Sequence, residues 1–204
     1  MMDIGALLKT FIYLISSSLL YPVLFLLVIF IVWIIIYAGS FFAEWLERVK
    51  LTVFSAAELS SFLRKENNKK IVSHRVSSYL KRLRFLLSKS QFEEIEIENL
   101  LQDTNLIMWK SLDRIRMIIR FGPSLGLIGT LIPMGTGLAA MGQGDMAKLS
   151  SDLVIAFTTT VVGLAIGMTA YFFYTVRRRW VEEDIKNMEL ATEILANDIL
   201  KEKK

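Results

Sequence analysis

The sequence contains no cysteine, a single histidine and only three prolines in 204 residues. Without cysteine the chain can form no disulfide and no zinc–thiolate site, and it has no thiol nucleophile. The histidine, His74, lies among lysines and arginines in a polar segment, where a surface position is more common than a ligand position. No nucleophile–base pair or phosphate-binding loop is evident either. We therefore expect no enzyme, no metal and no cofactor.

Charge is absent from three stretches, residues 19–42, 121–144 and 153–176. As a helix, each stretch would be about 36 Å long, which exceeds the roughly 30 Å hydrocarbon core of a bilayer. The hydrophobic fraction is 53% and the mean hydropathy is +0.46. These values predict an all-α membrane protein with three transmembrane helices. The first transmembrane helix, residues 19–42, is apolar on all sides, which is typical of a helix that faces lipid on most sides.

The other segments are polar or amphipathic. Residues 43–120 predict a cytoplasmic helical segment with a break at 66–69, residues 145–152 a short outer loop, and residues 177–204 a cytoplasmic helical tail. Apolar residues recur at alternating four- and three-residue spacing in both long polar segments, which predicts helices that pack on one another.

Residues 1–18 carry apolar side chains at helical spacing. This pattern predicts an amphipathic helix on the outer membrane surface. A signal peptide is the competing interpretation, but the apolar stretch that follows is too long for one.

The distribution of positive charge predicts the orientation. Fifteen of the 24 Lys and Arg residues lie in 43–120 and seven lie in 177–204. An even number of spans separates the two segments, so they share one side. The positive-inside rule places that side in the cytoplasm, and hence the N-terminus on the outer side. The membrane we expect is the cell inner membrane. This topology explains the net charge of +4 without a nucleic acid partner.

The second and third charge-free stretches are rich in Gly and Thr. Gly122 and Gly126, like Gly163 and Gly167, have the four-residue spacing that lets membrane helices approach closely. Pro133 is expected to kink its helix, either as a hinge or as a packing bend. The residues assigned to helix packing or hinging are Gly122, Pro123, Gly126, Gly129, Pro133, Gly163 and Gly167.

Hydroxyls are the candidate groups for an ion pathway, because the three charge-free stretches contain no ionisable Asp, Glu, Lys, Arg or His. Hydroxyls both donate and accept hydrogen bonds, and could hold water or steady a carboxylate supplied by another chain. The alternative is a purely structural role, in which each hydroxyl donates a hydrogen bond to a carbonyl of its own helix. Asp152 fits either an entrance carboxylate or an N-terminal helix cap, and the cap is favoured. The candidate hydroxyls belong to Thr130, Thr158, Thr159 and Thr160.

Two strings in these stretches resemble the motifs of the MotA/TolQ/ExbB proton channel family. They run from Gly122 to Thr130 and from Thr160 through Gly163-Leu164 to Ala170. The resemblance covers roughly residues 110–180, and the three-span topology is similar to the ExbB and TolQ branch. It departs from that branch at Ile155, where relatives often have Glu, at Thr169, where they often have Pro, and at Pro133, where they often have Gly.

The resemblance implies a homo-oligomeric ring, commonly of five copies, around the membrane helices of an ExbD-, TolR- or MotB-like single-span partner. That partner carries a membrane Asp that takes up and releases the ion, and Thr130 and Thr160 match the residues that face it. The implied function is an ion-conducting stator subunit driven by proton or sodium motive force. The rival hypothesis is a structural membrane scaffold that conducts nothing and recruits cytoplasmic partners.

Overall fold

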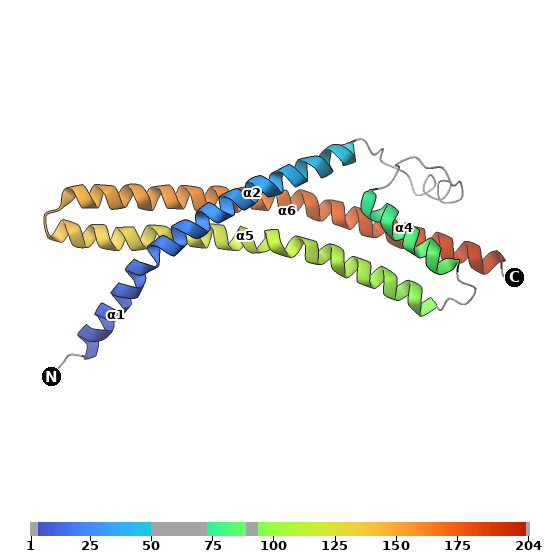
Figure 1. Cartoon of the computed structure of the whole chain (residues 1–204), viewed down its shortest axis with the longest axis horizontal. Helices are drawn as coiled ribbons and strands as arrows, with labels where there is room; N and C mark the ends of the chain where they lie inside the picture. Colours follow the sequence, from blue (N-terminus) through green and yellow to red (C-terminus); the bar gives the residue numbers. More distant parts are fainter. Residues whose placement is uncertain (1–3, 50–72, 89–93, 203–204) are drawn as a thin grey trace. The chain divides into compact units, whose positions relative to one another are not determined.

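The structure is a computed structural model that describes residues 4–49, 73–88 and 94–202. These residues form helices and no strand, which confirms the predicted all-α class. The expected break at 66–69 lies outside the described residues. The helices are α1 (Ile4–Ser18), α2 (Leu20–Val49), α4 (His74–Leu87), α5 (Glu94–Gly142) and α6 (Met146–Glu202) (Figure 1).

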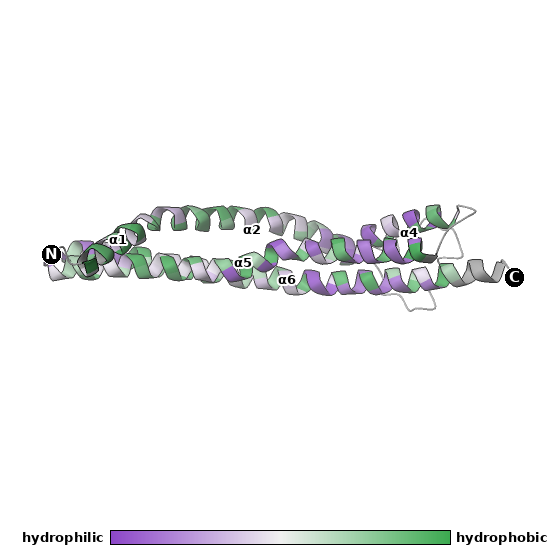
Figure 2. Cartoon of the chain, turned by 90° about the horizontal axis from the view of Figure 1, so that it is seen from below, coloured by the Kyte–Doolittle hydropathy of each residue, from purple (hydrophilic) through white to green (hydrophobic). Residues whose placement is uncertain are grey.

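Three helices, α2, α5 and α6, are long and apolar enough to cross a membrane, as predicted. At 1.5 Å per residue, α5 and α6 are roughly 74 Å and 86 Å long. Both therefore extend well beyond a hydrocarbon core of about 30 Å. Figure 2 shows the same division by hydropathy: hydrophilic residues concentrate in α4, in the N-terminal half of α5 and in the C-terminal half of α6.

Proline accounts for the junction between α1 and α2. Pro22 lies in the first turn of α2, where its ring opposes the carbonyl group of Ser18, four residues earlier. Helical hydrogen bonds nevertheless continue across Leu19, from its N–H to the Ile15 carbonyl (3.1 Å) and from the Val23 N–H to its own carbonyl (3.1 Å). The described part of α1 is exposed and apolar, with Phe11 61% exposed.

The chain forms two compact units, and α2, α5 and α6 contribute to both. The hairpin unit comprises Met1–Gly39 and Arg114–Tyr174. The polar unit comprises Ser40–Asp113 and Thr175–Lys204. The charge-free stretches fall almost entirely in the hairpin unit, so the candidate ion pathway belongs there.

In the hairpin unit, α5 and α6 run antiparallel and are joined by a turn at Gln143–Asp145 (Figure 1). Gly144 has φ +81°, the left-handed conformation that ends many helices. The Asp145 carboxylate accepts the Lys148 N–H (2.9 Å) and caps α6. Helix α6 therefore begins at Met146, and most of the segment 145–152, expected as an outer loop, forms its first turns.

Helix α2 covers part of the hairpin in this unit. The Tyr37 ring packs against Phe173 of α6 with centroids 5.8 Å apart, and Trp33 stacks on Tyr37 at 5.0 Å. The opposite side of α2 stays exposed, as at Phe25 and Ile36. Only 17% of the most apolar part of α2 is buried, against 33% for α5 and α6, so the rest of the chain covers α2 less than it covers the other two helices.

The polar unit has an apolar core made by the predicted stripes. Helix α4 buries Val76 and Leu83, and α6 buries Val181 and Met188. The buried Tyr79 hydroxyl bonds to the Thr192 hydroxyl (2.6 Å), and burial raises the pKa of Tyr79 above its ordinary value. The stripes thus serve helix packing within the chain.

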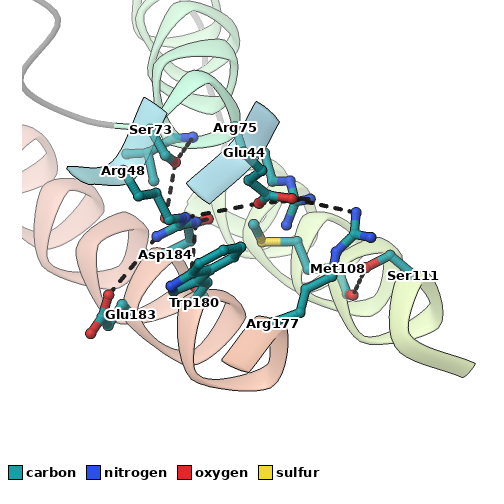
Figure 3. A network of polar contacts seen from close by, with 11 residues as sticks. Glu44, Arg48, Ser73, Arg75, Met108, Ser111, Arg177, Trp180, Glu183 and Asp184 are labelled. Atoms are coloured by element: carbon teal, nitrogen blue, oxygen red, sulfur yellow. Dashed lines mark hydrogen bonds and ion pairs between the residues drawn. The ribbon is translucent and has the colours of Figure 1, made fainter. Parts of the chain in front are cut away.

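A buried polar network joins α2, α4 and α6 in the polar unit (Figure 3). Asp184 is 2% exposed; its carboxylate contacts Arg48 of α2 at 2.5 Å and accepts the Ser73 hydroxyl at 2.9 Å. Ser73 also caps α4 through the Val76 N–H (3.3 Å). Arg48 lies 5.1 Å from the ring centroid of Trp180, within range of a cation–π interaction.

Glu44 forms the second acidic centre of this network. Its carboxylate lies 3.1 Å from Arg75, 3.6 Å from Arg177 and 3.8 Å from Arg48. Burial raises the pKa of Asp184, while Arg48 and the Ser73 hydroxyl oppose that rise. The network fixes the polar end of α2 and the start of α4 on α6.

Candidate functional site

Glycine brings the backbones of α5 and α6 into contact. A Cβ atom added at Gly163 would lie 2.7 Å from both the Gly122 carbonyl oxygen and the Gly126 Cα. One added at Gly167 would lie 2.6 Å from the Pro123 ring, and one added at Gly129 would lie 2.9 Å from the Thr159 Cβ. Real Cβ atoms do not come so close, and backbone atoms cannot move aside as a flexible side chain can.

The close approach brings two of the predicted hydroxyls together. Thr130 of α5 and Thr160 of α6 form a hydroxyl–hydroxyl hydrogen bond. Each hydroxyl also lies 3.2 Å from the Ala156 carbonyl oxygen, and Thr130 donates to the Gly126 carbonyl at 2.9 Å. Both side chains are only half-buried, so this Thr130–Thr160 pair remains open to a further donor or acceptor.

The other two candidate hydroxyls point elsewhere. Thr159 is 4% exposed, packs on Gly129 and bonds back to its own helix at the Ile155 (3.0 Å) and Ala156 (2.9 Å) carbonyls. Thr158 is exposed and bonds back to the Val154 carbonyl (2.7 Å). The structure therefore places Thr159 inside the hairpin and Thr158 on its open face, and brings only Thr160 to Thr130.

Asp152 is not a helix cap, because α6 begins six residues earlier and Asp145 caps it. Its carboxylate instead accepts a hydrogen bond from the Thr136 hydroxyl of α5 (2.7 Å). Thr136 is not among the hydroxyls predicted from the sequence. The Thr136–Asp152 pair is a second polar contact across the hairpin, nearer to the turn than the Thr130–Thr160 pair.

Proline occurs twice in α5 without ending it. The Pro123 ring fills the space beside Gly167. The Pro133 side chain is fully buried, and its carbonyl accepts the Thr136 hydroxyl (3.1 Å). Pro133 also leaves the Gly129 carbonyl without its helical N–H donor.

The two polar contacts are too far apart to exchange a proton directly. Six residues separate Thr130 from Thr136 and eight separate Asp152 from Thr160, which corresponds to about 9 Å and 12 Å along the helices. Proton transfer needs hydrogen-bond distances of about 3 Å. Buried Ala156 and Ile132 lie between the contacts in sequence. A continuous path would need water or a carboxylate from another chain.

The model of the MotA/TolQ/ExbB proton channel family matches residues 63–190. That is more than half of the chain and includes all of α5 and residues 146–190 of α6. The chain belongs to this family. It is accordingly a multi-pass membrane protein of a proton channel family, and three helices in its described part are long and apolar enough to span a membrane.

One relative is an ExbB homolog of Methanothermobacter thermautotrophicus, named for biopolymer transport. It is 32% identical to the chain over 84 residues, which is 41% of this chain and 30% of the relative. The match therefore spans less than a third of the relative's length. No solved structure matches the chain.

Proposed function

We propose that the chain is the ion-conducting stator subunit of a motor in the cell inner membrane. It would form a ring, commonly of five copies, around an ExbD-, TolR- or MotB-like single-span partner. The partner supplies a membrane Asp, and ion flow down the proton or sodium gradient becomes mechanical work. The N-terminus lies outside and the two basic segments lie in the cytoplasm, as the positive-inside rule requires.

The Thr130–Thr160 pair carries this proposal. It is a half-buried pair of hydroxyls within two charge-free stretches, and hydroxyls can serve both the ionised and the protonated form of a carboxyl group. The charge-free stretches hold no ionisable Asp, Glu, Lys, Arg or His of their own. A carboxyl group facing the pair must therefore come from another chain. Thr158 lies on the exposed face of the hairpin and offers a further hydroxyl to a neighbouring chain.

Replacing Thr160 by Val should reduce partner-dependent ion flux to the leak of empty liposomes. Valine keeps the shape of the side chain and removes the hydroxyl that pairs with Thr130. The measurement is ion flux into liposomes that contain the complex as purified from membranes. Unchanged flux would remove Thr160 from the pathway.

Ser124→Ala is the matched control for Thr160→Val. Ser124 lies on the neighbouring helix α5, where its side chain is exposed and its hydroxyl donates to the Arg120 carbonyl (2.8 Å). This variant should conduct at the wild-type rate. Both variants should assemble like the wild type, because neither changes a close glycine contact.

The non-conducting scaffold makes a different prediction for the purified complex. A scaffold would carry a soluble coiled-coil partner on its polar unit and lipid inside its ring. The stator would carry a single-span, Asp-bearing chain inside the ring. The mass of the intact complex distinguishes the two.

A further inference from the structure

The Thr136–Asp152 pair places a carboxylate beside an apolar helix. Thr136 lies within the charge-free stretch 121–144 of α5, and its hydroxyl is 2.7 Å from the Asp152 carboxylate. Asp152 is half-buried, so water can reach it. It precedes the third charge-free stretch by one residue. Ionisable groups in the transmembrane segments of membrane proteins usually serve function, and Asp152 lies at the end of such a segment.

The helices are closely packed at this level. A Cβ atom added at Gly137 would lie 3.3 Å from the Asp152 Cβ and 3.2 Å from a methyl carbon of Leu149. The Pro133 side chain on the same part of α5 is fully buried. The carboxylate is therefore held in place by packing as well as by its hydrogen bond.

No positive charge compensates Asp152 within the part of the chain that the structure describes. The ion pairs of the described residues all lie in the polar unit, and none of them involves Asp152. Lys148, one helical turn earlier, is exposed. A salt bridge does not explain why a carboxylate occupies this position.

The Thr136 hydroxyl can satisfy both charge states of Asp152. When the carboxyl is ionised, the hydroxyl proton points to it. When the carboxyl is protonated, the hydroxyl can turn to donate to the Pro133 carbonyl, 3.1 Å away, and its oxygen can accept a hydrogen bond from the carboxyl O–H. The Thr136–Asp152 hydrogen bond can therefore form in both states.

We propose that Asp152, with Thr136, is a proton-loading site at the turn end of the hairpin. The carboxylate takes a proton from water on the outer side and releases it toward a carboxylate of the partner. Thr136 is a positioning residue that holds Asp152 in both states. This proposal rests on the proposed ion-conducting function, and it adds a binding site within this chain.

Infrared spectroscopy of the purified complex tests the site without any flux. The wild-type minus Asp152→Asn difference spectrum should contain one carbonyl band of a protonated carboxyl, which appears on acidification. Thr136→Val should shift the frequency of that band, because the hydroxyl partner is lost. A band at an unchanged frequency in Thr136→Val would overturn the assigned contact.

Ion flux then tests the role. Asp152→Asn should lower partner-dependent proton flux by about a hundredfold or more, the lower end of what a positioned proton-transfer group contributes in general acid–base catalysis. Asp145→Asn is the matched control at the same end of the hairpin, because asparagine also caps helices well, and it should conduct normally. Wild-type flux in Asp152→Asn would overturn this proposal and leave the stator intact. A flux that requires sodium at constant pH would overturn the proton as ligand.

If the proposed stator function is wrong, the two experiments give a different pair of results. The wild-type complex would then conduct nothing, and the spectroscopic comparison of Asp152→Asn with Thr136→Val would still decide whether Asp152 binds a proton beside Thr136.

Discussion

Replacing Gly163 by Ala should destabilise the protein by at least about 2 kcal/mol, within the range for an overpacked core. The new methyl group would lie 2.7 Å from the Gly122 carbonyl oxygen and from the Gly126 Cα. Both are backbone atoms, so α5 and α6 must move apart. Alanine is by itself the better helix former by about 1 kcal/mol, and a loss of stability can therefore come only from the contact.

Gly135→Ala is the matched control on α5, because nothing lies within 4 Å of a Cβ atom added there. We expect the thermal unfolding midpoint in detergent to fall by roughly 4–8 °C for Gly163→Ala and to stay the same or rise for Gly135→Ala. Equal midpoints in the two variants would show that the helices do not approach as closely as the structure indicates.

Replacing Arg48 by Met should cost about 3 kcal/mol at neutral pH, because it leaves the Asp184 charge buried and without its ion-pair partner. The expected fall in the unfolding midpoint is roughly 6–12 °C for a chain of this size. Arg179→Met is the matched control. Arg179 is 80% exposed and lies 3.7 Å from Glu183, and such surface pairs contribute little.

The penalty at Arg48 should depend on pH in a defined direction. Burial raises the pKa of Asp184 above its ordinary value of 3.8, so the folded chain holds this proton more tightly than the unfolded chain. Proton binding therefore adds stability that is fully present below the unfolded value and is lost as the pH rises through the folded value. Arg48→Met removes a cause that lowers this pKa, which raises it further. The destabilisation should be largest at neutral pH and shrink on acidification; a penalty that grows on acidification would contradict this account.

The sequence predicts the close helix pair because its cause is local. Gly122, Gly126, Gly163 and Gly167 have a spacing with one physical meaning in a membrane helix, and the structure places all of them in the contact. The three spans are predictable for the same reason, since each depends on its own composition.

The partners of Thr136 and Asp152 depend on the register of the hairpin, which composition does not define. Gly144 defines it. Thr136 precedes Gly144 by eight residues and Asp152 follows it by eight, so antiparallel helices bring them level. Placing the loop at 145–152 conceals this symmetry, because Gly144 is then counted in the second span and Asp145 in the loop, rather than as the end of one helix and the cap of the next.

The polar network is harder to predict. Asp184 meets Arg48 and Ser73 across 136 and 111 residues of sequence. Each of these residues lies in a charged segment in which the sequence contains many other possible partners. Only the tertiary packing of α2, α4 and α6 selects these.

The central claim is that the hairpin conducts ions only together with a carboxyl group from a partner. The most direct measurement is proton flux into liposomes that contain the co-purified complex, compared with the same complex in which the partner's membrane Asp is replaced by Asn. We predict flux in the first preparation and only the leak of empty liposomes in the second. Equal flux in both, or flux through the chain alone, would contradict the account.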